Sequence, residues 1–207
     1  MYNSIFKNRT EAAILLVEKL KKYKNSNSVV LALPRGGVPL GSEIAKTLQL
    51  PLDIVLSKKI AHPSNKEFAI GAVSLDSTIL DEHPEIDKIY IENEIIRLQN
   101  VLREKYKLYR GDRKPIEIKG KNTILVDDGI ATGNTLLVTL EMLRKQGAAK
   151  IIVAVPVLSY NTVTIIEDQT DEFHYLIASK HFKSVGEFYE DFRQVDDEQV
   201  IQILNTS

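Results

Sequence analysis

Residues 124–135 read Ile-Leu-Val-Asp-Asp-Gly-Ile-Ala-Thr-Gly-Asn-Thr, and this stretch decides the fold. An apolar run typical of a buried strand stops at two acids, a loop of small residues follows, and a helix is expected to begin at Asn134 or Thr135. A helix N-terminus favours an anion, because it presents unpaired N–H groups and the positive end of the helix dipole. The adjacent carboxylates suit sugar hydroxyls or a hydrated cation. The segment therefore predicts a site for a phosphorylated sugar.

Apolar strands and amphipathic helices alternate along the chain around this stretch. Asn8 or Thr10 is expected to cap the first helix. Strands are expected at 28–33, 53–56, 123–126, 150–155 and 175–178, and further helices at 38–50, 87–110, 134–146, 162–167 and 196–204. This pattern predicts an α/β fold, with an open, mostly parallel sheet covered by helices on both faces. Ligands of such sheets lie beyond the carboxyl ends of the strands. The turns at 34–37 and 129–133 both belong to that edge and are expected to face one crevice.

The segment 57–84 has the least regular pattern of the chain. It contains only short β-like pieces, at 69–75 and 78–80, and is expected to form an irregular, flexible loop region. The helix that follows, Asp87–Arg110, is a candidate dimer face, although packing on its own sheet is the simpler expectation.

Bulk properties indicate a single soluble domain over residues 1–207. A net charge of −1 gives no general attraction to nucleic acid or to an anionic membrane. Cysteine is absent, which excludes disulfides and thiolate chemistry and fits a reducing cytoplasm. The apolar run at 12–17 is too short for a signal sequence, and the run at 151–158 is interrupted by Pro156 and too short to span a membrane. A cytoplasmic location is therefore expected.

Other motifs are less informative. The sequence has no complete Walker A or GxGxxG pattern, which argues against an NTPase or a dinucleotide enzyme. The histidines show no metal-ligand spacing and are expected to be structural or at the surface: His62, His83, His174 and His181. Three aromatic residues near the C-terminus could stack on a ligand or belong to the core: Phe188, Tyr189 and Phe192.

Residues 126–135 resemble the phosphoribosyl pyrophosphate (PRPP) binding motif of type I phosphoribosyltransferases, in which a strand, two acids and three residues precede Thr-Gly-x-Thr. The likeness extends over nearly the whole chain, to a bacterial and archaeal subgroup of predicted phosphoribosyltransferases. It is carried by Asn8-Arg9 and by residues 32–39, 51–55, 58–59, 70–73 and 185–192.

The resemblance implies a role for each motif. Asp127 and Asp128 would bind the ribose 2- and 3-hydroxyls, and Mg²⁺ directly or through water. The loop that follows would bind the 5-phosphate; it comprises Gly129, Ile130, Ala131, Thr132, Gly133, Asn134 and Thr135. A pyrophosphate loop would consist of Pro34, Arg35, Gly36 and Gly37, with Arg35 facing the leaving group and a cis peptide bond near Pro34-Arg35.

The resemblance also implies a hood over the site, built from 57–84 and from the C-terminal 180–207. Lys58 and Lys59 stand where the hood loop begins, and Lys59 is the candidate catalytic residue besides Arg35 and the two aspartates. Taken on its own, this lysine pair could equally be a solvated charge pair. Closure of 57–84 would exclude water from the reaction.

One position departs from the purine salvage enzymes of the family. Those acting on 6-oxopurines carry an aspartate where this chain has Ala131, so a 6-oxopurine acceptor is less favoured. The expected function is transfer of the 5-phosphoribosyl group of PRPP to a nucleobase or related heterocycle in nucleotide metabolism. The alternatives are a PRPP-sensing regulator that binds nucleic acid or a protein, and a non-catalytic member of the fold.

Overall fold

The computed structural model describes residues 6–75, 77–80 and 85–206. Three parts of the predicted hood segments therefore lie outside the described residues: residue 76, residues 81–84, which include His83, and residue 207. The helices are α1 (Arg9–Leu20), α2 (Gly37–Leu48), α3 (Lys88–Arg110), α4 (Asn134–Lys145), α5 (Val163–Glu167) and α6 (Asp197–Thr206). The strands are β1 (Ser28–Ala32), β2 (Leu52–Ile54), β3 (Lys58–His62), β4 (Asn65–Val73), β5 (Thr78–Leu80), β6 (Asn122–Val126), β7 (Lys150–Ser159) and β8 (Glu172–Ser179).

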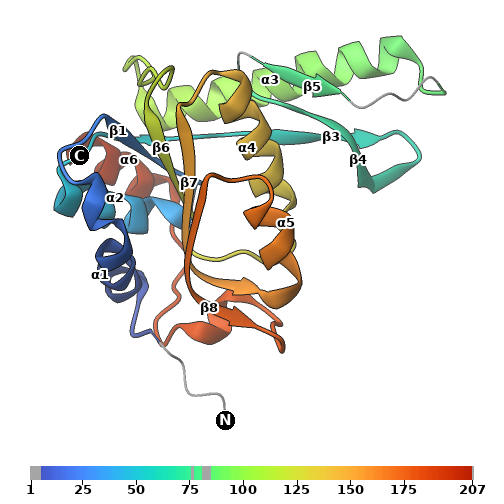
Figure 1. The fold of residues 1–207 in the computed structure, drawn as a ribbon. Coiled ribbons are helices and arrows are strands. Elements are labelled where there is room, and N and C mark those ends of the chain that lie inside the picture. Colours follow the sequence, from blue (N-terminus) through green and yellow to red (C-terminus); the bar gives the residue numbers. More distant parts are fainter. Residues whose placement is uncertain (1–5, 76, 81–84, 207) are drawn as a thin grey trace.

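The centre of the molecule is a five-stranded sheet in the order β2-β1-β6-β7-β8, in which all neighbouring strands are parallel. Successive residues of each strand face opposite layers. In β6, Ile124 and Val126 pack in the layer of α1 and α2, whereas Leu125 packs in the layer of α4. Figure 1 shows α1 and α2 on one side of the sheet and α4 and α5 on the other. The predicted fold class is confirmed.

The order of the strands reverses between β1 and β6. From β1 the chain crosses through α2 to β2 on one side, and from β6 it crosses through α4 to β7 on the other. Open α/β sheets bind ligands at such a switch point, beyond the carboxyl ends of the two strands. The turn after β1 and the acids after β6 both lie there.

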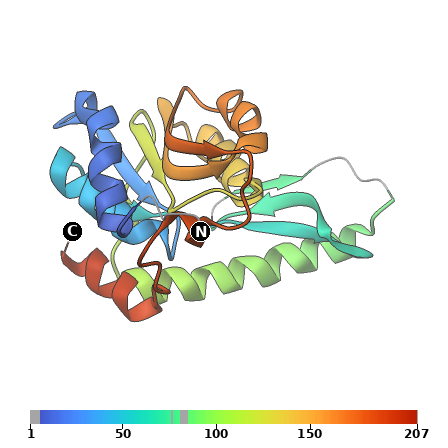
Figure 2. The same cartoon turned by 90° about the horizontal axis from the view of Figure 1, so that it is seen from below.

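The expectation of an irregular region at 57–84 is wrong for its described part, which forms a three-stranded antiparallel sheet in the order β3-β4-β5. The prediction missed β3 because this strand buries only Ile60 fully and its pairing with β4 is interrupted by irregularities around Ala61. In Figure 2 this second sheet extends away from the core and lies beside the long helix α3.

Helix α3 has the predicted bounds within one residue, and the Asp87 side chain caps its first turn by accepting a hydrogen bond from Ile89 N. It packs chiefly on the antiparallel sheet, where Leu98 and Leu102 join a small core with Ile60 and Ile70. Packing on its own sheet is thus the right expectation for the last turns of the helix, which reach β2, whereas most of the helix packs on the antiparallel sheet instead.

A buried ion pair fixes the end of α3 to β2. Arg110 Nε donates to Asp53 Oδ1 over 2.7 Å, and both side chains are only 9% exposed. The same carboxylate accepts from Ile54 N and, through Oδ2, from Ile116 N. The pair therefore ties together a helix, a strand of the central sheet and the segment that leads to β6.

Strand β7 continues four residues past its predicted end, through Pro156. Its pairing with β6 ends at Ala154, and the pairing with β8 skips position 156, so the proline, which has no N–H, stands at a gap in the ladder. Among the described helices, none is both long enough and apolar enough to cross a membrane.

Candidate active site

The turn after β1 and the acids after β6 lie against each other at the switch point. Leu33 N donates to Val126 O over 2.9 Å. A Cβ atom on Gly36 would lie 2.0 Å from Asp128 Oδ2, and one on Gly37 would lie 2.6 Å from Val126 O. Both glycines are therefore needed for close approach, and the peptide bond between Pro34 and Arg35 is cis, as the resemblance implies. The structure brings the two predicted loops into one site.

Each aspartate of the acidic pair is held through one carboxylate oxygen. Asp127 Oδ1 accepts from Asp128 N over 2.8 Å. Asp128 Oδ2 accepts from Arg9 Nε and Nη2 over 3.0 and 2.8 Å. In the described parts of the chain, no donor is recorded for Asp127 Oδ2 or Asp128 Oδ1. The pair therefore keeps two oxygen atoms for a ligand.

Burial raises the pKa of both carboxyls. For Asp127 the neighbouring charge of Asp128 raises the pKa further, and the pKa lies well above its usual value. For Asp128 the guanidinium of Arg9 opposes the effect of burial, but the pKa remains raised. A cationic or hydrogen-bonding ligand would favour the ionised form of the pair.

Arg35 lies at the edge of this site and is partly held by the C-terminal helix. Its Nη1 is 3.6 Å from Asp197 Oδ1, at the start of α6. Asp197 also accepts from Lys105 Nζ over 2.9 Å and from Tyr109 OH over 2.6 Å. Because the Arg35 side chain is 39% exposed and its ion pair is long, the guanidinium remains accessible to an anion.

A cavity of about 420 Å³ connects these groups. Asp128, Gly36 and Arg35 line one part of it, and the C-terminal segment lines the other through Phe192, Gln194 and Val195. The sequence analysis placed this C-terminal segment in the hood and named Phe192 as a possible ligand contact, but it did not single out Gln194 or Val195.

The predicted phosphate loop leads directly into α4. Gly133 has φ +77°, and no side-chain cap is recorded at the start of this described helix, so its first N–H groups remain open to a ligand. Ile130 differs from its neighbours because its side chain is buried in the core, and its backbone bonds to Val157 and Ser159. Ile130 therefore anchors the loop.

Lys58 and Lys59 share a second cavity, of about 620 Å³, with the start of α4. Asn134 and Thr135 line it from the helix, and Phe68 and Ala69 line it from β4. The structure thus places the lysine pair beside the predicted phosphate loop.

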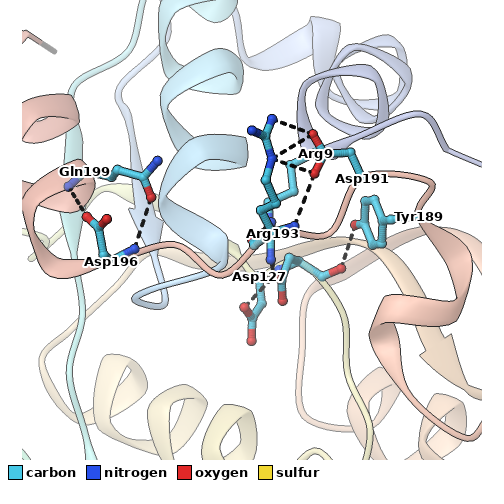
Figure 3. A network of polar contacts seen from close by, with 8 residues as sticks. Arg9, Asp127, Tyr189, Asp191, Arg193, Asp196 and Gln199 are labelled. Atoms are coloured by element: carbon cyan, nitrogen blue, oxygen red, sulfur yellow. Dashed lines mark hydrogen bonds and ion pairs between the residues drawn. The ribbon is translucent and has the colours of Figure 1, made fainter.

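Arg9 is the residue of the site to which the sequence assigned no role. Besides its two bonds to Asp128, it donates from Nη1 to Arg193 O over 2.9 Å, and its Cζ lies 4.0 Å from the centre of the Phe192 ring. Figure 3 shows Arg9 beside Arg193 of the C-terminal segment, with Asp127 nearby. The only sequence signal was its place, directly after the cap of the first helix and within the family likeness.

The C-terminal aromatic residues divide between core and cavity. Tyr189 is buried, and its hydroxyl donates to Asp128 O over 2.7 Å. Phe188 stacks on Phe182, whereas Phe192 stacks on Tyr189 and also lines the cavity beside Asp128. Phe188 and Tyr189 thus pack with the core, whereas Phe192 also faces the cavity.

Within the described part of the chain, no group of three or more His, Asp or Glu side chains could hold a metal ion by itself. His174 instead lies 3.1 Å from Glu172 on the edge strand β8. Any cation at Asp127 and Asp128 would therefore need further ligands from a substrate or from water.

Comparisons with known proteins agree on the family. The phosphoribosyl transferase domain family matches residues 1–193. The crystal structure of a Thermus thermophilus protein superimposes with a TM-score of 0.89 and 38% identity, over 97% of both chains. A Mycobacterium tuberculosis protein, provisionally named a phosphoribosyl transferase, is 32% identical over 206 residues, which are 97% of this chain and 46% of that protein.

A shorter match of 39 residues is 54% identical to the ribose-phosphate pyrophosphokinase of Pyrococcus furiosus and covers 19% of this chain. The chain spans about half the length of the Mycobacterium relatives that it matches. The family match over most of the sequence, together with the two loops that meet at the switch point, shows that the chain belongs to the phosphoribosyl transferase domain family.

Proposed function

We propose that the protein transfers the 5-phosphoribosyl group of PRPP to a nitrogenous acceptor, with Mg²⁺ as cofactor and with release of pyrophosphate. The observation that carries the proposal is the contact between the Gly36 turn and the Asp128 carboxylate. It unites a turn suited to an anion with acids suited to sugar hydroxyls in one site.

PRPP has three parts, and the site offers a matching group for each. The uncapped start of α4, with Thr132 and Thr135, would take the 5-phosphate. Asp127 and Asp128 would accept hydrogen bonds from the ribose hydroxyls. The turn 34–37, with Arg35, would hold the pyrophosphate. Lys58 and Lys59 would add positive charge from the side of the antiparallel sheet.

In the reaction, a nitrogen of the acceptor bonds to C1 of the ribose while the C1–O bond to pyrophosphate breaks. The bonding electrons leave with the pyrophosphate, and the acceptor loses its proton to a base or to water. Arg35 would stabilise the negative charge that develops on the leaving group. The protein contributes chiefly by positioning the reactants and by neutralising charge.

The donor set fits Mg²⁺. This ion prefers oxygen ligands and is typically held by one or two carboxylates together with substrate phosphates and water. Asp127 Oδ2 and Asp128 Oδ1 are carboxylate oxygens of this kind. Both are available, because neither accepts a recorded hydrogen bond from the described residues. When bound, Mg²⁺ would supply positive charge to the pyrophosphate.

The acceptor would be a nucleobase or a related heterocycle. Position 131 is an exposed alanine without a titratable group, so the loop supplies no base at this position. This departure from the 6-oxopurine enzymes favours other heterocycles.

Pyrophosphate release from PRPP and Mg²⁺ across a panel of heterocycles tests the function. Turnover with one acceptor supports a transferase, whereas PRPP binding without turnover on any acceptor favours the sensor alternative. Replacing both Asp127 and Asp128 by asparagine should strongly weaken PRPP binding. Asp168→Asn is the matched control, because Asp168 is exposed and follows α5, where the chain returns to the start of β8. Unchanged PRPP affinity in the double variant would reject the site assignment.

A further inference from the structure

The Arg9 guanidinium is held on several sides at once. Its side chain is 12% exposed, although it lies at the start of α1, near the surface of the molecule. Nε, Nη1 and Nη2 each donate to a protein oxygen, and one face of the group rests on Phe192. So many contacts on one cation fix its position.

The two bonds to Asp128 have an unusual distribution. Arg–carboxylate pairs commonly join two nitrogens to two oxygens. Here Nε and Nη2 both donate to Oδ2. The other oxygen, Oδ1, has no recorded donor among the described residues, and Asp128 lines the cavity that contains Arg35.

The backbone of Asp128 is held as well. Its N–H donates to Asp127 Oδ1, and its carbonyl accepts from Tyr189 OH. Three neighbouring side chains therefore determine where the Asp128 carboxylate points, and Arg9 is the one that contacts the carboxylate itself.

We infer that Arg9 is a positioning residue for sugar recognition, which grips Oδ2 of Asp128 so that Oδ1 is presented to a ribose hydroxyl. This inference rests on the proposed function, because it names a further residue of the same PRPP site. Arg9 acts through Asp128 and leaves the pyrophosphate to Arg35. Three of its nitrogens already donate to two protein oxygens, whereas Arg35 has one long ion pair and is 39% exposed.

The chemistry of the contact requires arginine. Lysine has the charge but not the planar fork that places two donors on one oxygen while a third reaches a carbonyl. Lysine also cannot stack flat on Phe192 as a guanidinium does. Arg9→Lys should therefore recover only part of the function that Arg9→Gln loses.

A double-mutant cycle on the full chain tests the inference, with PRPP affinity measured by titration calorimetry in the presence of Mg²⁺. Arg9→Gln should weaken PRPP binding about 10- to 100-fold, the range typical of second-layer partners of ligating groups. In an Asp128→Asn background, the same change should cost less than about twofold, because its effect passes through Asp128. Arg97→Gln is the control, since it removes a two-bond Arg–carboxylate pair, with Glu94, on the exposed face of α3.

A second probe separates positioning from direct contact. Inorganic pyrophosphate without metal contains no sugar, so its affinity should be unchanged in Arg9→Gln. Three results would each overturn the inference. They are an equal loss of PRPP affinity in both backgrounds, a fall in pyrophosphate affinity in Arg9→Gln, and unchanged PRPP affinity in Arg9→Gln. Thermal unfolding identifies a variant that fails to fold, in which case Arg9→Lys takes its place in the cycle. If the wild-type chain does not bind PRPP, the proposed function itself fails.

Discussion

Arg35 Nη1 lies 3.6 Å from Asp197 Oδ1, so a residue of the proposed pyrophosphate turn is paired with the first residue of the C-terminal helix. A bound pyrophosphate would compete with this carboxylate for the guanidinium. Tyr109 and Lys105 hold Asp197 in place from α3, and their hydrogen bonds lower its pKa. The competing charge is thus a fixed part of the site.

Asp197→Asn should therefore tighten the binding of inorganic pyrophosphate. The expected gain is about two- to fivefold at low salt, because a partly exposed ion pair contributes less than about 1 kcal/mol. Asp196→Asn is the control, since this neighbouring carboxylate caps Gln199 N and does not contact Arg35. An equal gain in both variants would indicate a general charge effect and contradict the specific competition.

Gly36→Ala should abolish or strongly weaken PRPP binding, with a loss of about tenfold or more. Gly36 has φ −60°, which alanine adopts easily, so the effect would come from the overlap of the new Cβ with the Asp128 carboxylate. Gly120→Ala is the converse control. It strains a residue with φ +71°, but nothing lies within 4 Å of its Cβ, so it should lower stability without changing PRPP affinity.

Asp53→Ala should destabilise the protein by about 3–5 kcal/mol, because it leaves Arg110 as a buried charge without its partner. Urea unfolding of the variant measures the loss. Glu18→Gln, which breaks an exposed ion pair with Lys21, should cost less than about 1 kcal/mol. Similar losses of unfolding free energy in the two variants would show that burial does not increase the contribution of the Asp53–Arg110 pair to stability.

Glu172 should make the stability of the protein depend on pH in the acidic range. Burial alone would raise the pKa of its carboxyl, but hydrogen bonds, among them those with Lys22 and His174, outweigh burial and lower the pKa from 4.5 to about 2. A lowered pKa stabilises the folded state above the unfolded-state value, and this contribution is lost as the pH falls from 4.5 toward 2.

Glu172→Gln should accordingly be less stable than the wild type at pH 7, by on the order of 2–3 kcal/mol, and at least half of this difference should be gone at pH 3. Unfolding free energies of both proteins at several pH values measure it. Glu141→Gln, in an exposed pair with Lys145, should show little difference at any pH. A difference for Glu172→Gln that is constant between pH 7 and pH 3 would refute the assignment.

The centre of the parallel sheet could be predicted because β1, β6 and β7 are buried on both faces and carry continuous apolar runs, such as Ile124–Val126 in β6. The two loops of the site, 34–37 and 129–135, could be predicted because each is formed by one short, continuous stretch of the sequence. Strand β3 could not, since its side chains are largely half-exposed and its order comes from pairing with β4. The role of Arg9 could not either, because its partner Asp128 lies 119 residues away and no spacing rule connects them.

Two segments far apart in the sequence, 6–9 and 188–190, meet at Asp128. Phe6 N donates to Phe188 O, Glu190 N donates to Phe6 O, and Arg9 and Tyr189 both bind Asp128. Contacts between residues this distant in sequence form slowly, since a long loop must close before they can stabilise the fold. The Asp128 carboxylate, which we propose binds the sugar, would therefore be among the last groups to be ordered during folding, and a nascent chain could not complete this proposed site until the segment around Tyr189 had been synthesised.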